Sequence, residues 1–179
     1  MRMPRSAVRL RQVRHGDIPA IHAWLKDPTF HGDFLFGWFG AEDDFTAMKK
    51  KLDVFLKQGQ ARRFLAVERT SDNMLVGLVL LQKGRRADCR YMGVYVETSS
   101  RGKGFGSEAM SQLVDYIFKT EKSVDRIEAA TSTMNIPSQK ALEKIGFRSE
   151  GIKRKTAFRD GHWEDSVLYA LAKGEFRRS

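Results

Sequence analysis

Several classes of protein are excluded by what this 179-residue chain lacks. Its one cysteine, Cys89, cannot form an intramolecular disulfide, and its place within an apolar stretch predicts simple packing. No apolar run approaches the roughly 20 residues of a membrane span, and the N-terminus lacks the apolar centre of a secretory signal. The histidines are scattered without the spacing of a metal site. They are His15, His22, His31 and His162. The sequence therefore predicts a cytoplasmic protein that binds neither a metal nor a membrane.

The composition is ordinary for a globular protein, but the charge is not. Hydrophobic residues make up 41% and charged residues 30%, and no linker, repeat or low-complexity tract divides the chain, so we expect a single domain over residues 1–179. Lys and Arg number 32 against 22 Asp and Glu, which gives a net charge of +10. Such a charge favours an anionic partner or neighbourhood, of which ribosomal RNA is one candidate, while solubility alone explains it equally well. No recognition-helix, zinc-ligand or RNP-type pattern points to direct nucleic-acid recognition.

The most informative feature present is the run Arg101-Gly102-Lys103-Gly104-Phe105-Gly106. Before it, the β-branched and aromatic residues of 89–96 predict a strand. After it, apolar residues at three- and four-residue intervals predict a helix from about Phe105. Glycines let the backbone come close to a ligand, and a helix start offers unpaired N–H groups and the positive end of its dipole. This order of strand, glycine loop and helix predicts a phosphate-binding turn.

Other interpretations of the glycine run fit less well. A P-loop needs Gly-Lys-Ser/Thr, but Lys103 is followed by Gly104. A dinucleotide fingerprint is half met by Gly102, Gly104 and Ser107, with Glu128 at a suitable distance for a ribose hydroxyl, yet the further βα units that such a fold needs do not follow. If no other part of the chain supports phosphate binding, a glycine-rich turn that binds no ligand is the default interpretation.

Other parts do agree, and together they resemble the GNAT N-acetyltransferase superfamily. The pattern Arg101-x-x-Gly104-x-Gly106 resembles its acyl-CoA-binding motif. Three later segments resemble the strand, the Asn-led helix start and the helix exit that follow in that family: 126–131, 135–138 and 143–147. The segment 160–169 resembles the branch that acetylates ribosomal proteins at their N-terminal amine. The resemblance spans nearly the whole chain.

The resemblance implies a fold and a cosubstrate. The fold is α+β, with a mixed, mostly antiparallel central sheet that splays at the cofactor site and helices on both faces. The cosubstrate is acetyl-CoA, whose pyrophosphate lies in the glycine turn and whose pantetheine arm pairs with the strand before it. The residues implied to bind it are Val94, Val96, Arg101, Gly102, Lys103, Gly104, Phe105, Gly106, Asn135 and Ser138. Asn135 is also a strong helix N-cap, which explains it without a ligand.

Hydrophobic spacing and turn residues predict the order of elements. Strands are expected at 8–13, 63–68, 74–82, 89–96 and 126–131, followed by two last strands joined through Asp160-Gly161. Helices are expected at 17–25, 45–55, about 105–118 and 136–145. Gly146 closes the last of these helices.

The chain departs from better-marked relatives at two catalytic positions. Leu142 stands where many carry a tyrosine that protonates the departing thiolate, and Ala130 stands where some carry a glutamate. Ser138 is then the hydroxyl that we expect near the thiol. Glu128, two residues from Ala130, and Glu97, at the end of the 89–96 strand, are candidate bases acting through water. A solvated surface role also explains either glutamate taken singly.

The acceptor site is expected in the segment 30–44, where aromatic and acidic residues crowd together. Such residues suit an amine-bearing substrate, although packing explains each aromatic equally well. They are Phe30, Phe34, Phe36, Trp38 and Phe39 with Asp33, Glu42, Asp43 and Asp44. We expect an N-acetyltransferase, a monomer or homodimer, that acts on a peptide or ribosomal-protein N-terminal amine. A polyamine, aminoglycoside or amino-acid acceptor and a non-catalytic CoA-binding module are the alternatives.

Overall fold

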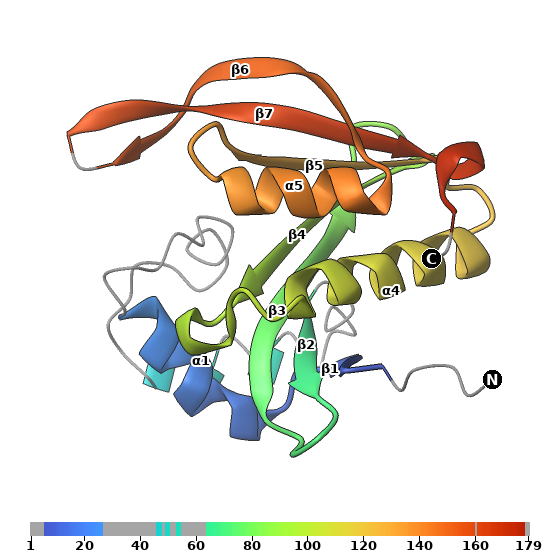
Figure 1. Ribbon diagram of the computed structural model, residues 1–179. Helices are drawn as coiled ribbons and strands as arrows, with labels where there is room; N and C mark the ends of the chain where they lie inside the picture. Colours follow the sequence, from blue (N-terminus) through green and yellow to red (C-terminus); the bar gives the residue numbers. More distant parts are fainter. Residues whose placement is uncertain are drawn as a thin grey trace. The chain divides into compact units, whose positions relative to one another are not determined.

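The computed structural model describes residues 6–26, 46, 47, 49, 50, 53, 54, 64–159 and 161–177 (Figure 1). Contacts divide the chain into two compact units, and each is described by itself. Unit 1 comprises residues 1–80 and 94–109, and unit 2 comprises 81–93 and 110–179. Three elements contribute residues to both units: β3 (Leu75–Lys83), β4 (Cys89–Val96) and α4 (Phe105–Thr120). The single domain expected from the sequence stays a prediction.

Seven strands follow one hydrogen-bonded order, β1-β2-β3-β4-β5-β7-β6. The remaining strands are β1 (Val8–Gln12), β2 (Phe64–Arg69), β5 (Arg126–Ser132), β6 (Arg148–Arg159) and β7 (His162–Ala172). The pairs β1–β2, β2–β3, β5–β7 and β6–β7 are antiparallel, whereas β4 and β5 are parallel. The parallel register matches Cys89–Tyr91 with Arg126–Glu128. A mixed, mostly antiparallel sheet confirms the predicted fold class.

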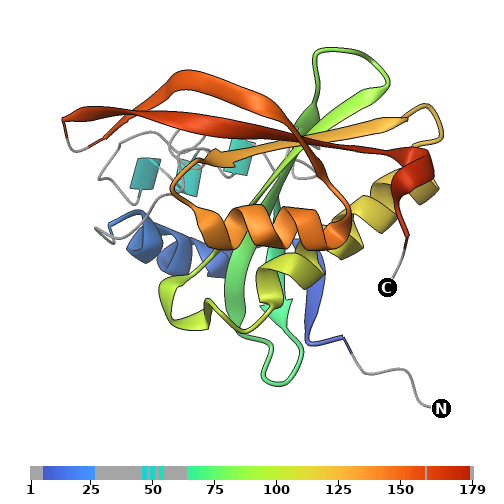
Figure 2. The ribbon, with the colours of Figure 1, turned by 45° about the horizontal axis from the view of Figure 1, so that its top comes forward.

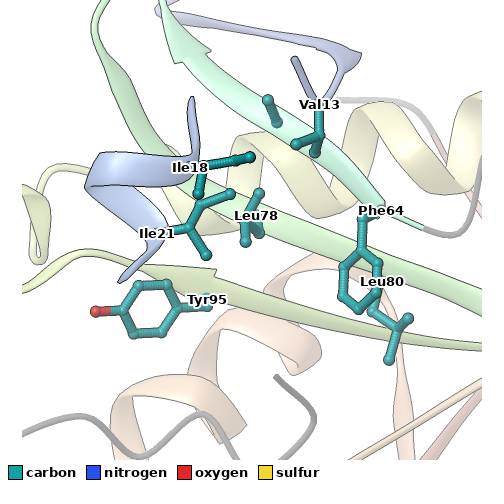
Figure 3. Close-up of a cluster of buried hydrophobic side chains, with 8 residues drawn as sticks. Val13, Ile18, Ile21, Phe64, Leu78, Leu80 and Tyr95 are labelled. Atoms are coloured by element: carbon teal, nitrogen blue, oxygen red, sulfur yellow. The ribbon is translucent and has the colours of Figure 1, made fainter. Parts of the chain in front are cut away.

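The core of unit 1 lies between α1 (Ile18–Leu25) and strands β2, β3 and β4. A proline in the first turn suits the start of α1, and Ile18 and Ile21 form its buried face. Figure 3 shows these two side chains with Leu78 of β3 and Tyr95 of β4. The buried cluster consists of Val13, Ile18, Ile21, Phe64, Ala66, Leu78, Leu80 and Tyr95. This apolar packing anchors β4, the strand that leads into the glycine turn.

A buried ion network ties β1 to β2 within unit 1. The guanidinium of Arg11 donates to both carboxylate oxygens of Asp17, at 2.7 and 2.8 Å, and its Nε donates to Glu68. Arg9 Nε also donates to Glu68, at 2.7 Å. Burial alone would raise the pKa of Glu68, but the hydrogen bonds from Arg11 and Arg9 outweigh it and hold that pKa below its ordinary value. Glu68 is therefore a paired, buried carboxylate at neutral pH.

Unit 2 places α5 (Ile136–Ile145) beside β5 and β7 (Figures 1 and 2). Leu142 and Ile145 are buried on its inner face, and the Tyr169 hydroxyl of β7 donates to Glu143 at 2.9 Å. Gly146 ends the helix with a φ of 109°, a left-handed cap that glycine adopts readily. The helix is therefore fixed at its end by a cap and along its length by packing.

A long bulge interrupts β6 in unit 2. Lys153 pairs with Ser166 and Ala157 pairs with Glu164, so β6 advances four residues while β7 advances two. Lys155 has a φ of 52°, and its N–H donates to a carboxylate oxygen of Asp165 at 2.9 Å. The exposed residues Lys153, Arg154 and Lys155, which we call the basic bulge, are thereby displayed on the last strand of the sheet.

The single cysteine lies inside unit 2. Cys89 is 2% exposed, and burial raises the pKa of its thiol. A Cβ added at Gly84 would lie 2.6 Å from the sulfur, so glycine is needed beside it. Packing, as the sequence predicted, is the role of this residue.

The predicted element order is confirmed over the described residues. The strand Cys89–Val96 and the helix Ile136–Ile145 have the predicted bounds, and the other described strands agree within a few residues. The predicted helix 45–55 is described only in part, and the residues seen there are helical. Among the helices that the structure describes, none combines the length and the apolar character needed to cross a membrane.

Candidate functional site

The glycine run forms a tight turn between β4 and α4 in unit 1. After a short 3-10 turn, η3 (Thr98–Ser100), the chain passes through Gly102 and Gly104, with φ of 75° and 82°. α4 begins at Phe105, and the N–H of Glu108 donates to the carbonyl of Gly104 at 3.0 Å, the first bond of the helix. The N–H groups before Glu108 have no partner further back in the helix, which is the condition for binding an anion there.

Two of the glycines are required by conformation and a third by packing. The φ values of Gly102 and Gly104 lie in the left-handed region that other residues rarely adopt. A Cβ built at either position would meet no heavy atom within 4 Å, so these residues border open space. A Cβ at Gly106 would instead lie 3.2 Å from the Val96 side chain. Because Gly106 has no side chain, the first turn of α4 can pack closely against β4. The turn thus offers bare backbone to a ligand.

Two cations flank Gly102. Arg101 Nε donates to the carbonyl of Val96 at 3.0 Å, and its guanidinium lies 5.7 Å from the centre of the Tyr95 ring. Lys103 Nζ donates to the carbonyl of Ser99 at 3.0 Å. Both positive groups are held at the turn, where the dipole of α4 also favours negative charge. Val94 and Val96, predicted to meet the pantetheine arm, are half-buried on β4 just before this turn.

Glu97, predicted as a candidate base, is the N-cap of η3. Its carboxylate accepts from the Ser99 N–H at 2.8 Å and from the Ser99 hydroxyl at 2.6 Å, and also from the Ser100 hydroxyl. Burial would raise its pKa, but the hydrogen bonds from Ser100 and Ser99 outweigh it and leave the pKa below the ordinary value. A carboxylate with this pKa is a weak base at neutral pH.

Asn135 and Ser138 meet at the start of α5 in unit 2. The side-chain oxygen of Asn135 accepts from the Ser138 N–H at 3.2 Å, which is an N-cap bond. Gln139 steadies the same turn by donating to the carbonyls of Ser132 and Thr133, at 3.2 and 2.9 Å. Ser138 itself is half-buried, directly after the exposed residues 134–137.

Glu128, the other candidate base, lies on β5 in unit 2. It accepts from Arg126 Nε at 2.9 Å, and Arg126 also pairs with Glu150 of β6. Tyr91 is the register partner of Glu128 across the parallel pair β4–β5, and burial raises the pKa of its hydroxyl. Sequence reasoning missed Tyr91, because only strand register brings it opposite Glu128.

One further residue of the predicted site, Leu142, can be placed. Leu142 is 2% exposed, so the position of the usual tyrosine points into the core of unit 2. The predicted acceptor residues, from Phe30 to Asp44, lie outside the described residues. Within the described part of the chain, no group of three His, Cys, Asp or Glu side chains could hold a metal ion.

Left-handed glycines, flanking cations and a helix start after a sheet strand define an acyl-CoA-dependent N-acetyltransferase domain. Residues 7–148 match the family model described as an acetyltransferase (GNAT) domain. The chain belongs to this family, which uses acetyl-CoA as the acetyl donor.

Similar proteins agree with this assignment. The chain is 38% identical to the probable N-acetyltransferase YjcK of Bacillus subtilis over 56% of each chain, so the match spans about half the length of that relative. It is 28% identical to the uncharacterized N-acetyltransferase YnaD of the same organism, over 93% of this chain and 94% of YnaD. It is 29% identical to the [ribosomal protein uS5]-alanine N-acetyltransferase of Escherichia coli, over 67% of this chain and 62% of that one.

Solved structures support the fold. A GNAT-family acetyltransferase from Bacillus anthracis superposes with a TM-score of 0.74 at 24% identity, over 94% of this chain and 96% of that chain. The spermidine N-acetyltransferase of Vibrio cholerae, solved in complex with CoA and spermine, superposes with a TM-score of 0.77 at 19% identity, over 95% of this chain and 98% of that chain.

Proposed function

We propose that this protein transfers the acetyl group of acetyl-CoA to the α-amine of a peptide or ribosomal protein. The observation that carries the cofactor part is the pair Gly102 and Gly104, which border open space at the start of α4 with Arg101 and Lys103 beside them. We assign the CoA pyrophosphate to this turn, from Arg101 to Gly106, with Phe105 buried beneath it. The room and the positive charge fit a doubly charged phosphate group.

The rest of the cofactor is assigned by the same reasoning. From the resemblance, we assign the pantetheine arm to the backbone of β4 at Val94 and Val96, and we assign Asn135 and Ser138 to the binding of the thiol. Because the Asn135 side chain accepts from the Ser138 N–H, it holds the first turn of α5 and with it the half-buried Ser138. These assignments name the residues that would bind acetyl-CoA.

The reaction is a direct attack. A neutral amine adds to the thioester carbonyl carbon, the new C–N bond forms, the C–S bond breaks, and the nitrogen loses a proton. The departing CoA thiolate takes a proton, for which Ser138 is the proposed donor. Glu128 is the proposed base through water; its carboxylate accepts from Arg126 Nε at 2.9 Å, which fixes its position. Glu97 is the second carboxylate that the sequence suggested for this role, but its hydrogen bonds to Ser99 and Ser100 favour a structural role over that of a base.

An α-amine suits a site without a strong base. An α-amine titrates near 7.7 to 8.0 and a lysine-type amine near 10.4, so the latter needs help worth about 3.5 kcal/mol to become neutral. Position 130, where some relatives carry a glutamate, holds an alanine and cannot provide it. The similarity to the uS5-alanine acetyltransferase also favours a ribosomal-protein acceptor.

The basic bulge supports a setting rich in RNA. Lys153, Arg154 and Lys155 are exposed on β6, and the chain as a whole carries a net charge of +10. Phosphate backbones attract such clusters without sequence preference. We infer that the enzyme acts in the cytoplasm beside ribosomal RNA, as a monomer or homodimer.

The test is a comparison of acceptors by release of free CoA thiol from acetyl-CoA. Short peptides with a free α-amine should be turned over with a higher kcat/KM than the same peptides with a blocked α-amine and than free polyamines. The Vibrio cholerae neighbour was solved with spermine, so spermine and spermidine are the proper competitors. Equal or better turnover of the polyamines would replace the peptide by a polyamine as acceptor. No thiol release with any amine would favour a CoA-binding module.

A further inference from the structure

The carboxylate of Glu97 stands where β4 passes into the phosphate-binding turn. β4 ends at Val96, and the N–H of Glu97 donates to the carbonyl of Val76 on β3 at 2.9 Å. The backbone of Glu97 is therefore fixed to a central strand, while its side chain reaches forward over η3. Glu97 thus connects a fixed strand to η3, which leads into the glycine turn.

Three donors from η3 converge on the carboxylate. One oxygen accepts from the Ser99 N–H, and the other accepts from the hydroxyls of Ser99 and Ser100. Ser100 is 1% exposed, so water cannot replace the carboxylate as its partner. A buried donor that loses its acceptor carries a desolvation penalty, and hydrogen bonds to charged acceptors are the stronger kind. Glu97 therefore fixes the conformation of η3.

The cations of the turn depend on the same residues. Lys103 Nζ donates to the carbonyl of Ser99, one of the residues that Glu97 holds. Arg101 donates through its backbone N–H to Thr98, at 3.3 Å, and through Nε to Val96. A displacement of η3 would move the carbonyls of Thr98 and Ser99 to which Arg101 and Lys103 bond, together with the glycines that follow. The position of the positive charge thus follows the position of η3.

A negative charge at this point is unexpected on electrostatic grounds. A carboxylate beside an anion-binding turn repels the anion, so a neutral residue here would serve a phosphate better. The charged groups that act on Glu97 and η3 are Lys103 and, from β2, Arg69. They compensate part of the repulsion, while the three donors use the carboxylate as an acceptor. The geometry is that of a structural support whose carboxylate is bonded to η3.

We propose that Glu97 is a positioning residue that holds η3 and the two cations in the geometry that binds the CoA pyrophosphate. The inference rests on the proposed role of the Arg101 to Gly106 turn in CoA binding. It predicts that the favourable hydrogen bonds of the carboxylate outweigh its repulsion of phosphate. Glu97 then contributes to acetyl-CoA affinity without touching the acetyl group or the amine.

The decisive variant is Glu97→Gln, which keeps the size of the side chain and removes the charge. If Glu97 positions the turn, the variant binds acetyl-CoA about tenfold or more weakly by calorimetry, the equivalent of one charge-assisted hydrogen bond, and KM rises more than kcat falls. If its charge merely repels phosphate, affinity increases. If it is a base, kcat falls while affinity is unchanged. Either of the last two results overturns the proposal.

Two further variants guard against a trivial loss of folding. Ser100→Ala removes a buried donor but keeps the charge of Glu97, and the proposal predicts weaker acetyl-CoA binding, whereas unchanged affinity contradicts it. Asp115→Asn removes one negative charge from an i,i+4 pair with the exposed Lys119 on α4 and should leave affinity unchanged. Circular dichroism melting shows that each variant is folded at the assay temperature. A parent protein that fails to bind acetyl-CoA refutes the proposed function, whereas binding that Glu97→Gln leaves unaltered refutes only this inference.

Discussion

Substitution of Gly104 tests two separate effects, that of the backbone conformation on stability and that of an added side chain on acetyl-CoA binding. With a φ of 82°, alanine at this position would be forced into the left-handed region, at a cost of about 1–2 kcal/mol. No neighbouring atom lies within 4 Å of the added Cβ, so steric overlap adds nothing to that cost. For a domain of this size we expect Gly104→Ala to lower the melting temperature by about 2–8 °C.

The same Cβ would project into the space that we assign to the pyrophosphate. Acetyl-CoA affinity should therefore fall well beyond the loss of stability, and Gly104→Val should abolish binding in calorimetry. Gly16 offers a matched control, because a Cβ there also meets no atom within 4 Å but its φ lies outside the left-handed region. Gly16→Ala should change neither melting nor binding. If Gly104→Ala melted and bound acetyl-CoA like the parent, both the strained backbone and the phosphate site would be refuted.

Three other predictions concern chemistry, stability and charge. Ser138→Ala should lower kcat by about 10²–10⁴-fold with acetyl-CoA affinity nearly intact in steady-state and calorimetric assays; weaker binding with unchanged kcat would remove Ser138 from the chemistry. Arg11→Met should cost about 3–5 kcal/mol in urea unfolding, because it removes the guanidinium from the buried carboxylates of Asp17 and Glu68 and leaves Glu68 with Arg9 alone. Since the pKa of Glu68 is lowered in the folded state, the stability that this group contributes is present above about pH 4.3 and is lost as the pH falls through the folded pKa. The loss of stability in acid should therefore be smaller in Arg11→Met than in the parent. An unchanged dependence of stability on pH would contradict the pairing of Arg11 with Glu68. Replacement of the three cations of the basic bulge by glutamate should weaken binding to ribosomal RNA and reduce the salt dependence of that binding, both measured by filter binding. Acetylation of peptides in the absence of RNA should be unchanged. RNA binding equal to that of the parent would place the RNA contact elsewhere on the protein.

Local signals in the sequence were sufficient for the elements that hold the site. Asn135 and Gly146 mark the two ends of α5, and the glycine run marks the end of β4 and the start of α4. Each of these signals acts within a few residues, through a cap or a backbone conformation. For this reason the bounds of β4 and α5 could be predicted from the sequence.

Features that depend on contacts between distant residues could not be predicted. Arg11 and Glu68 are separated by 57 positions, and only the pairing of β1 with β2 brings them together. The left-handed residue of the β6 bulge is Lys155, where a glycine would have been the usual signal. The serines two and three residues after Glu97 are a signal for a cap, whereas its place at the end of a strand suggested a candidate base or a solvated surface residue.

The burial of Cys89 has a practical consequence for enzymology. The chain has no other cysteine, and this one is 2% exposed with a thiol pKa raised by burial, so the folded protein presents no reactive thiolate. A thiol-reactive dye added to a reaction mixture would then respond to the CoA set free at each turnover and not to the enzyme. In the absence of acetyl-CoA the same dye would report the opening of the protein interior, so one reagent could follow both catalysis and unfolding.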